Sequence, residues 1–221
     1  MGNLTNAQKS IWATEQYYMG SSVNNICGTA LIQEKVDFEK LKESIEIVCQ
    51  KHDNFWLEFK IEGGKVKQVL SKREHIKIDT INIDDPKNLE KEREKIVRTT
   101  FKLENSKLFN FYIFKFTDGK GAFMLNIHHL ISDAWTLALI CNEIIKTYSS
   151  LKQKQEIETK AIYSYMDYIK SEKEYQKSEK FNKDRQYWKN KFKIIPEVAS
   201  IPGSKKEKIK CYNKCTMPRT S

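Results

Sequence analysis

Two adjacent histidines are the residues of this sequence best suited to proton transfer. The chain contains 4 His, and the segment that holds two of them reads His128-His129-Leu130-Ile131-Ser132-Asp133-Ala134-Trp135. An imidazole, with an ordinary pKa of about 6.5, can accept or donate a proton near pH 7. Because the pair ends a predicted strand and is followed by an acid where a helix is predicted to begin, the segment has the layout of an acid–base site.

The two imidazoles are expected to have different tasks. Neighbouring residues of a strand point to opposite faces of a sheet, so His128 and His129 cannot both reach one substrate or one metal ion while both stay in the strand. The pair also lacks the glutamate and the helical spacing of an H-E-x-x-H zinc motif, and we expect no metal site. One ring should therefore face a site while the other supports it.

The residues after the pair are candidates for supporting roles. Asp133 is expected to be a buried acid that caps the following helix. The free N–H groups at that helix N-terminus would suit a developing oxyanion. Ser132 and Trp135 are candidates to line or prop the site. Each residue also has a plain structural interpretation, as a helix cap or as part of the core, and only their joint occurrence favours chemistry.

The pattern of apolar residues predicts the elements that position this segment. Helices are expected over residues 5–18, 38–51, 89–99 and 135–148, and over 162–192 in two pieces. Strands are expected over residues 26–33, 55–61, 65–70, 77–83, 108–116 and 122–128. The last strand is apolar on both faces, which indicates a central position in a sheet. Hairpins mixed with helices predict an α+β fold, in which a mixed sheet is flanked by helices.

Length and charge limit the organisation of the chain. Its 221 residues are enough for one large domain or two small ones. The net charge is +10, and residues 189–221 carry nine Lys or Arg against two acids. Such a tail is typical of a nucleic-acid arm or of a solvated linker. Since it is rich in Lys and poor in aromatic side chains, we expect no nucleic-acid partner.

The sequence also indicates a compartment. No basic segment followed by an apolar stretch opens the chain, and no apolar stretch is long enough to span a bilayer, so we expect neither a signal peptide nor a membrane partner. The 5 Cys are expected to be reduced thiols of a cytoplasmic protein. The spacing Cys211-x3-Cys215 lacks the paired cysteines and the histidines of a zinc site.

Four motifs, in order along the chain, resemble those of one family. The histidine segment resembles the H-H-x-x-x-D-G motif of the condensation domains of non-ribosomal peptide synthetases, which share the chloramphenicol acetyltransferase-like fold. The family's opening S-x-A-Q-x-R-L-W is similar to Thr5-Asn6-Ala7-Gln8-Lys9-Ser10-Ile11-Trp12. Its R-H-E-x-L-R motif is similar to Lys51-His52-Asp53-Asn54-Phe55-Trp56. Its Y-x-D-Y motif is similar to Tyr165-Met166-Asp167-Tyr168, and Tyr187-Trp188 matches the usual end of that region.

The resemblance implies a chloramphenicol acetyltransferase-like half-domain with a defined reaction. Residues 1–193 would be the N-terminal lobe, and residues 194–221 a basic linker or the start of the second lobe. The family joins a donor acyl or peptidyl thioester to the amine of an acceptor aminoacyl thioester, both on the phosphopantetheine arms of carrier proteins. By this likeness His129 would be catalytic and His128 and Asp133 structural. The lobe would bind no cofactor of its own and would be inactive without the C-terminal lobe, which completes the tunnel.

Two departures from the family pattern lie in the motifs of the site. Ala134 replaces the final Gly of the histidine motif, and Trp56 occupies the position of the arginine that pairs with the motif aspartate in the family. Asp133 would then need another partner, either its own helix N-terminus or Arg98.

Other functions share parts of this pattern. A CoA-dependent acyltransferase of the same superfamily would use His129 to activate a hydroxyl or an amine. An epimerisation domain also carries the histidine motif. A non-enzymatic basic binding module would use the segment only as core and would bind acidic partners through its Lys-rich tail. We expect the condensation reaction ahead of these alternatives.

Overall fold

The computed structural model of the chain describes residues 2–157 and 164–194. Internal contacts divide the chain into two compact units, residues 1–174 and 175–221. Cys211-x3-Cys215 and most of the Lys-rich tail lie outside the described residues. The expected lobe boundary at residue 193 stays a prediction.

The larger unit is built on a mixed four-stranded sheet with the strand order β2-β7-β6-β5. These strands are β2 (Asn25–Ile32), β5 (Ile78–Ile83), β6 (Phe109–Phe116) and β7 (Gly121–His128). β7 pairs antiparallel with both β2 and β6, whereas β5 pairs parallel with β6. Every residue of β7 is buried, as its apolar character on both faces predicts. The β-strand that carries the first histidine is therefore central and rigidly held.

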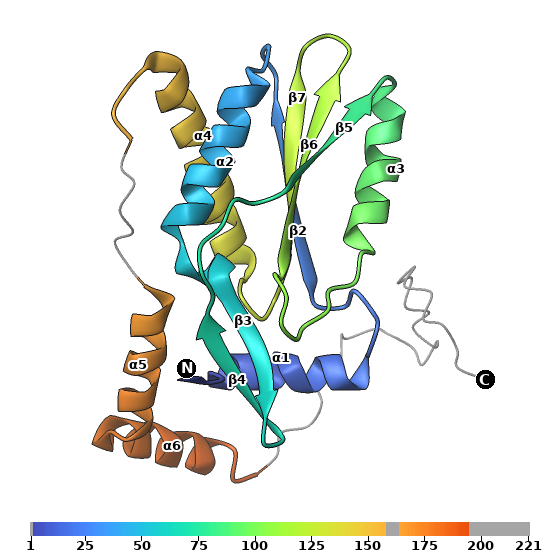
Figure 1. The fold of residues 1–221 in the computed structure, drawn as a ribbon. Coiled ribbons are helices and arrows are strands. Elements are labelled where there is room, and N and C mark those ends of the chain that lie inside the picture. The colour runs from blue at the N-terminus through green and yellow to red at the C-terminus, as the bar shows by residue number, and fades with distance from the viewer. Residues whose placement is uncertain (1, 158–163, 195–221) are drawn as a thin grey trace, which may run out of the picture. The chain divides into compact units, whose positions relative to one another are not determined.

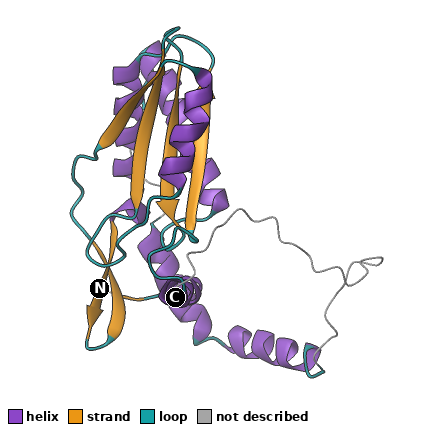
Figure 2. Cartoon of the chain, turned by 90° about the vertical axis from the view of Figure 1, so that its right-hand side faces the viewer, coloured by secondary structure: helices purple, strands orange, loops and turns teal. Residues whose placement is uncertain are grey.

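Helices cover both faces of this sheet (Figures 1 and 2). The helices are α2 (Phe38–Lys51), α3 (Pro86–Val97) and α4 (Ala134–Gln153). On one face, the α2 and α4 side chains pack with Phe123, Leu125 and Ile127 of β7. On the other face, α3 packs against Met124 and the alternate residues of the same strand. The expected α+β class, with a mixed sheet between helices, is confirmed.

A helix and a small sheet close the end of the main sheet at which β7 stops (Figure 1). They comprise β1 (Gly2–Asn3), α1 (Asn6–Tyr17), the 3-10 turn Asp53–Trp56, β3 (Leu57–Glu62) and β4 (Lys65–Leu70). The α1 helix begins at a capping box, in which Thr5 accepts from the Gln8 N–H and the Gln8 side chain accepts from the Thr5 N–H. These elements therefore surround the loop that follows β7.

Several element boundaries differ from the sequence expectation, among them those of the first hairpin, α3 and α4. The first hairpin begins at Leu57 rather than residue 55, because residues 53–56 form a 3-10 turn. The α3 helix begins at Pro86 rather than residue 89, since proline is accommodated in a first turn. The α4 helix continues to Gln153, five residues beyond the expected end at residue 148.

Residues 165–191 form two helices, as predicted, whereas the expected helix start at residue 162 lies outside the described residues. These are α5 (Tyr165–Gln176) and α6 (Glu179–Lys191). The start of α5 is tied to the larger unit, because the Asp53 carboxylate accepts from the Tyr165 N–H at 2.9 Å. Within the smaller unit, Tyr175 donates to Asp184 at 2.7 Å, and the ring of Trp188 in α6 stacks on that of Phe192, the residue that follows the helix. Among the described helices, none has the length and apolar character to cross a bilayer.

Candidate active site

The strand carrying the pair ends between the two histidines. His128 is the last residue of β7, and its ring is buried with 2% of the residue exposed. His129 lies in the turn beyond, is half-buried, and donates its backbone N–H to the Asn24 carbonyl at 2.9 Å. The alternation of side chains across a strand therefore does not apply to His129, because the strand has already ended. The two rings are nevertheless separated in task, because they make hydrogen bonds to different partners.

The ring of His129 is held through one nitrogen only. Its Nδ1 lies 3.0 Å from the Ser132 carbonyl oxygen. A carbonyl can only accept, so in the neutral ring Nδ1 carries the proton and Nε2 keeps its lone pair. Within the described part of the chain, Nε2 has no hydrogen-bonding partner. The geometry presents Nε2 as a free acceptor of a proton or of an N–H group.

His128 has the opposite tautomer. Its Nδ1 accepts the Leu130 N–H at 3.1 Å, so Nε2 carries the proton and donates to Glu15 Oε1 at 3.1 Å. Burial lowers the pKa of His128, and the Glu15 carboxylate offsets only part of that effect. A neutral, buried ring with both nitrogens engaged cannot exchange protons with a substrate. His128 therefore has the geometry of a supporting residue.

Asp133 is exposed, so the expectation of a buried acid is wrong. Its Oδ1 accepts both the backbone N–H and the hydroxyl of Thr136, each at 2.7 Å, which makes it the N-cap of α4. These bonds from Thr136 hold the pKa of the Asp133 carboxyl below its usual value. Of the two partners expected from the sequence, the helix N-terminus is the one found, since Arg98 lies 4.0 Å from Glu94.

The Asp133 cap also bears on the expectation that the α4 N-terminus stabilises a developing oxyanion. An ionised carboxylate at the start of α4 places a negative charge there and occupies the Thr136 N–H. A second negative charge beside it would be disfavoured. The α4 N-terminus is therefore a poor place to stabilise an oxyanion, which corrects the sequence expectation.

Trp56 fills the core at the position where the family carries arginine. Only 1% of the residue is exposed, and its indole N–H donates to the Cys49 carbonyl at 2.9 Å. The Lys107 ammonium lies 5.2 Å from its ring centroid. This position supplies packing rather than an ion pair for Asp133.

The two candidate lining residues lie in different surroundings. Ser132 is buried, and its carbonyl holds the His129 ring. Trp135 is 74% exposed in the first turn of α4. Ser132 therefore contacts the His129 ring through its backbone. Most of the Trp135 residue is accessible to solvent.

Three segments that are distant in sequence meet at the loop after β7. The Gln8 side chain donates to the Leu130 carbonyl and the Asn54 side chain to the Ile131 carbonyl, each at 3.0 Å. The Asn24 carbonyl accepts the His129 N–H. The first two residues come from the segments Thr5–Trp12 and Lys51–Trp56. These segments thus have a direct physical task, which is to fix the peptide groups around His129.

Sequence reasoning did not single out Gln8, Glu15, Asn24 or Asn54. A signal for Glu15 was present in the helical spacing. Residues 8, 11, 12 and 15 fall on one face of α1, and that face carries Ile11 and Trp12. A carboxylate on an apolar face requires a buried partner, and here the partners are His128 and Asn24. No local pattern marks Asn24 or Asn54.

The cysteines of the described residues are poor candidates for a nucleophile. Cys27, Cys49 and Cys141 are free thiols. Burial raises the pKa of Cys27 and of Cys141 to about 11, and that of Cys49 well above its usual value. Each is therefore protonated near neutral pH. In the same part of the chain, no three His, Cys, Asp or Glu side chains cluster as a metal site would require.

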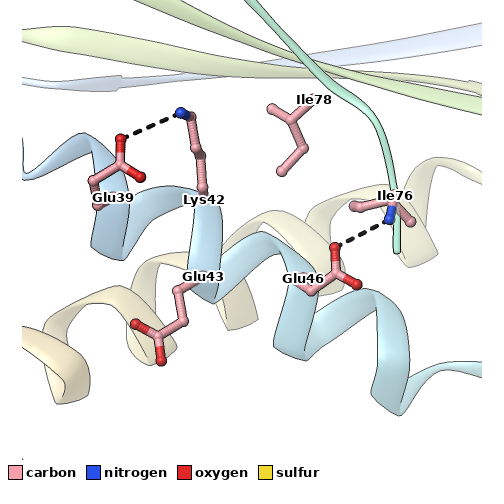
Figure 3. A pocket seen from close by; sticks show the side chains of 6 residues that line it. All are labelled: Glu39, Lys42, Glu43, Glu46, Ile76 and Ile78. Atoms are coloured by element: carbon pink, nitrogen blue, oxygen red, sulfur yellow. Dashed lines mark hydrogen bonds and ion pairs between the residues drawn. The ribbon is translucent and has the colours of Figure 1, made fainter. Parts of the chain in front are cut away.

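A surface hollow beside α2 has no residue of the histidine segment in its lining (Figure 3). It is lined by Glu39, Lys42, Glu43, Glu46, Ile76 and Ile78. Lys42 pairs with Glu39 at 3.2 Å, and Glu46 accepts the Ile76 N–H at 3.2 Å. Because two of its three acids already have partners, the hollow offers little chemistry of its own.

Comparisons with known proteins match one protein family over most of the chain. The family described as Condensation domain matches residues 1–214. Surfactin synthase subunit 1 of Bacillus subtilis (strain 168) is 29% identical over 206 residues, covering 90% of this chain and 6% of that protein. The dimodular nonribosomal peptide synthase of the same organism is 23% identical over 207 residues, covering 90% of this chain and 8% of that protein.

Solved structures of similar fold are also condensation domains. The starter condensation domain of the rhizomide synthetase RzmA matches with a TM-score of 0.81 and 19% identity, covering 90% of this chain and 49% of that chain. The first condensation domain of the calcium-dependent antibiotic synthetase matches with a TM-score of 0.79 and 18% identity, with the same coverage. The chain thus spans about half the length of these solved domains, and a small fraction of the curated synthases.

Proposed function

Because the chain belongs to the condensation-domain family of peptide synthetases, we propose that it is the N-terminal lobe of an amide-forming domain. In this proposal the donor is an acyl or peptidyl thioester, and the acceptor is the amine of an aminoacyl thioester. Both are delivered by carrier proteins on phosphopantetheine arms. Family membership supports an acyl-transferring activity, and the site geometry supports this particular reaction.

The observation that carries the proposal is the free Nε2 of His129. The acceptor amine must use its lone pair to attack the donor carbonyl carbon, after which the C–S bond breaks and the thiolate leaves. An α-amine, with a pKa near 8, is mostly protonated at pH 7, so a nearby acceptor favours its reactive form. Nε2 is fixed as such an acceptor by the bond from Nδ1 to Ser132. It either orients the amine or takes its proton, and both roles use the same nitrogen.

A similar domain supports this choice of substrates. A double mutant of the starter condensation domain of the rhizomide synthetase RzmA has been solved in complex with C8-CoA and Leu-SNAC. These are an acyl thioester and an aminoacyl thioester, which are the two classes proposed here. For this chain we propose carrier proteins as the partners that deliver them, and no cofactor bound by the lobe itself.

The test is amide formation from two loaded carrier proteins. One carrier bears an acyl thioester and the other an aminoacyl thioester, and the amide product is followed by mass spectrometry. The assay is run with this chain alone, with the synthetase chain that contains it, and with His129→Ala in each. We expect product only from the longer chain, and its loss in His129→Ala. Product at full rate from the 221-residue chain would contradict the proposed need for the second lobe.

A parallel assay separates the related acyltransfer reaction. The donor carrier is replaced by acyl-CoA and the acceptor by a free amine or alcohol. Turnover that needs no carrier protein and is lost in His129→Ala would replace the condensation proposal with CoA-dependent acyltransfer. Carrier-dependent amide formation that survives His129→Ala would remove His129 from the reaction.

A further inference from the structure

One carboxylate oxygen connects the two residues that hold the peptide groups on either side of His129. Glu15 Oε1 accepts from Asn24 Nδ2 at 2.7 Å and from His128 Nε2 at 3.1 Å. The Asn24 carbonyl accepts the His129 N–H at 2.9 Å, and His128 Nδ1 accepts the Leu130 N–H at 3.1 Å. Glu15 is thus two hydrogen bonds away from both peptide groups that flank His129.

Burial of Glu15 and His128 makes each of them depend on the other for a hydrogen bond. Glu15 is 7% exposed and His128 is 2% exposed, and the Phe101 ring packs edge-on against the His128 ring at 6.1 Å. Bulk water cannot readily replace the hydrogen bond between these two buried groups if either of them is removed. The positions of Asn24 and His128 are therefore coupled to each other through Glu15.

We propose that Glu15 is a positioning residue for the reaction, holding the backbone on both sides of His129 so that its ring bonds Ser132 through Nδ1 and presents Nε2. This inference rests on the proposed role of His129. It assigns to α1 a task in the reaction itself, in addition to its packing. Displacement of a reacting group by about 1 Å can cost on the order of 100-fold in rate, so small shifts of this turn matter.

Three substitutions distinguish a positioning role of Glu15 from an effect of its charge or of its buried volume. Glu15→Gln keeps an Oε1 acceptor for both donors, whereas Glu15→Met keeps the buried volume without an acceptor. Asn24→Ala removes only the side-chain link and leaves the carbonyl that holds His129. As a matched control, Glu172→Met removes another carboxylate that contacts α1, since Glu172 Oε1 accepts the Asn6 N–H at 3.1 Å.

The first readout is steady-state amide formation by the synthetase chain that contains these residues. We expect Glu15→Met to lower kcat by about 10-fold to 100-fold with little change in the KM for either carrier. Asn24→Ala should lower kcat in the same direction by less, while Glu15→Gln and Glu172→Met stay close to the parent. Equal losses in Glu15→Gln and Glu15→Met would overturn the inference, as would an unchanged kcat in a folded Glu15→Met protein.

The second readout needs no activity. With only 4 His in the chain, ring nitrogens can be assigned by ¹⁵N NMR of the 221-residue protein at a pH where the rings are neutral. The parent should show His129 protonated at Nδ1 and His128 at Nε2, and Glu15→Met or Asn24→Ala should mix the His129 tautomers. A His129 tautomer indifferent to both substitutions would refute the positioning role. If the tautomers respond to the substitutions but the longer synthetase chain forms no amide, the proposed function alone would be refuted.

Discussion

Asp133 gives a quantitative test of how the histidine loop is supported. In the structure its carboxylate is exposed and makes two bonds, both to Thr136, at 2.7 Å. Loss of such a helix cap costs about 1 kcal/mol, within a range of about 0.5–2 kcal/mol. Loss of one partner of a buried ion pair costs about 3–5 kcal/mol. The two interpretations of this motif aspartate therefore differ by more than the error of an unfolding experiment.

We predict that Asp133→Ala lowers the free energy of unfolding by about 1 kcal/mol, measured by urea denaturation at pH 7. For a chain of this size the melting temperature should fall by about 2–4 °C. Asp133→Asn keeps a capping oxygen and should stay close to the parent. Asp37→Ala is the matched control, because Asp37 caps α2 by accepting the Lys40 N–H at 3.1 Å.

Two results would refute this reasoning. A loss of about 3 kcal/mol or more in Asp133→Ala, well above that in Asp37→Ala, would indicate a buried ionic partner. An Asp133→Asn variant as unstable as Asp133→Ala would show that charge, not the cap, matters. The pH dependence gives a further check. The pKa of Asp133 is lowered in the folded state, so its contribution is present above the ordinary value of 3.8 and is lost as the pH falls through the folded value.

Two further predictions concern the packing of α4. A Cβ on Gly28 would lie 3.1 Å from Leu137 Cγ, so Gly28→Val should destabilise the fold by about 1–3 kcal/mol in urea denaturation, and an unchanged stability would contradict that contact. Burial raises the pKa of Glu143, but the bonds from Lys51 and His52 lower it by more than burial raises it. The pKa of Glu143 is therefore below its usual value. Glu143→Gln should therefore be less stable than the parent at pH 7, with a difference that shrinks as the pH falls below 4.5, whereas a pH-independent difference would refute the ionic contribution.

Much of the fold could be predicted because its signals are local. The apolar pattern of residues 122–128 identified the central strand, and the helical patterns over residues 5–18 and 38–51 identified two helices that the structure confirms. The missed start of the first hairpin depends on nonlocal contacts. The 3-10 turn before β3, for example, is held by Asn54 and Trp56, which bond to carbonyls in other elements.

The site was predicted only in part, because its support comes from backbone groups. Residue types could identify the histidine pair, but not that a Ser132 carbonyl selects the His129 tautomer. The exposure of Asp133 could not be predicted from the motif, because residue types and their spacing do not fix which side chains cover the start of α4. The assignment of His129 as catalytic stays a prediction.

The measurement that tests the central claim most directly is single-turnover amide formation by the synthetase chain carrying His129→Asn. An asparagine amide can still donate to the Ser132 carbonyl, but it places no acceptor where Nε2 lies. If Nε2 orients or deprotonates the acceptor amine, the rate should fall by about 100-fold or more while both carriers still bind. A rate within a few-fold of the parent would show that amide formation does not depend on that nitrogen.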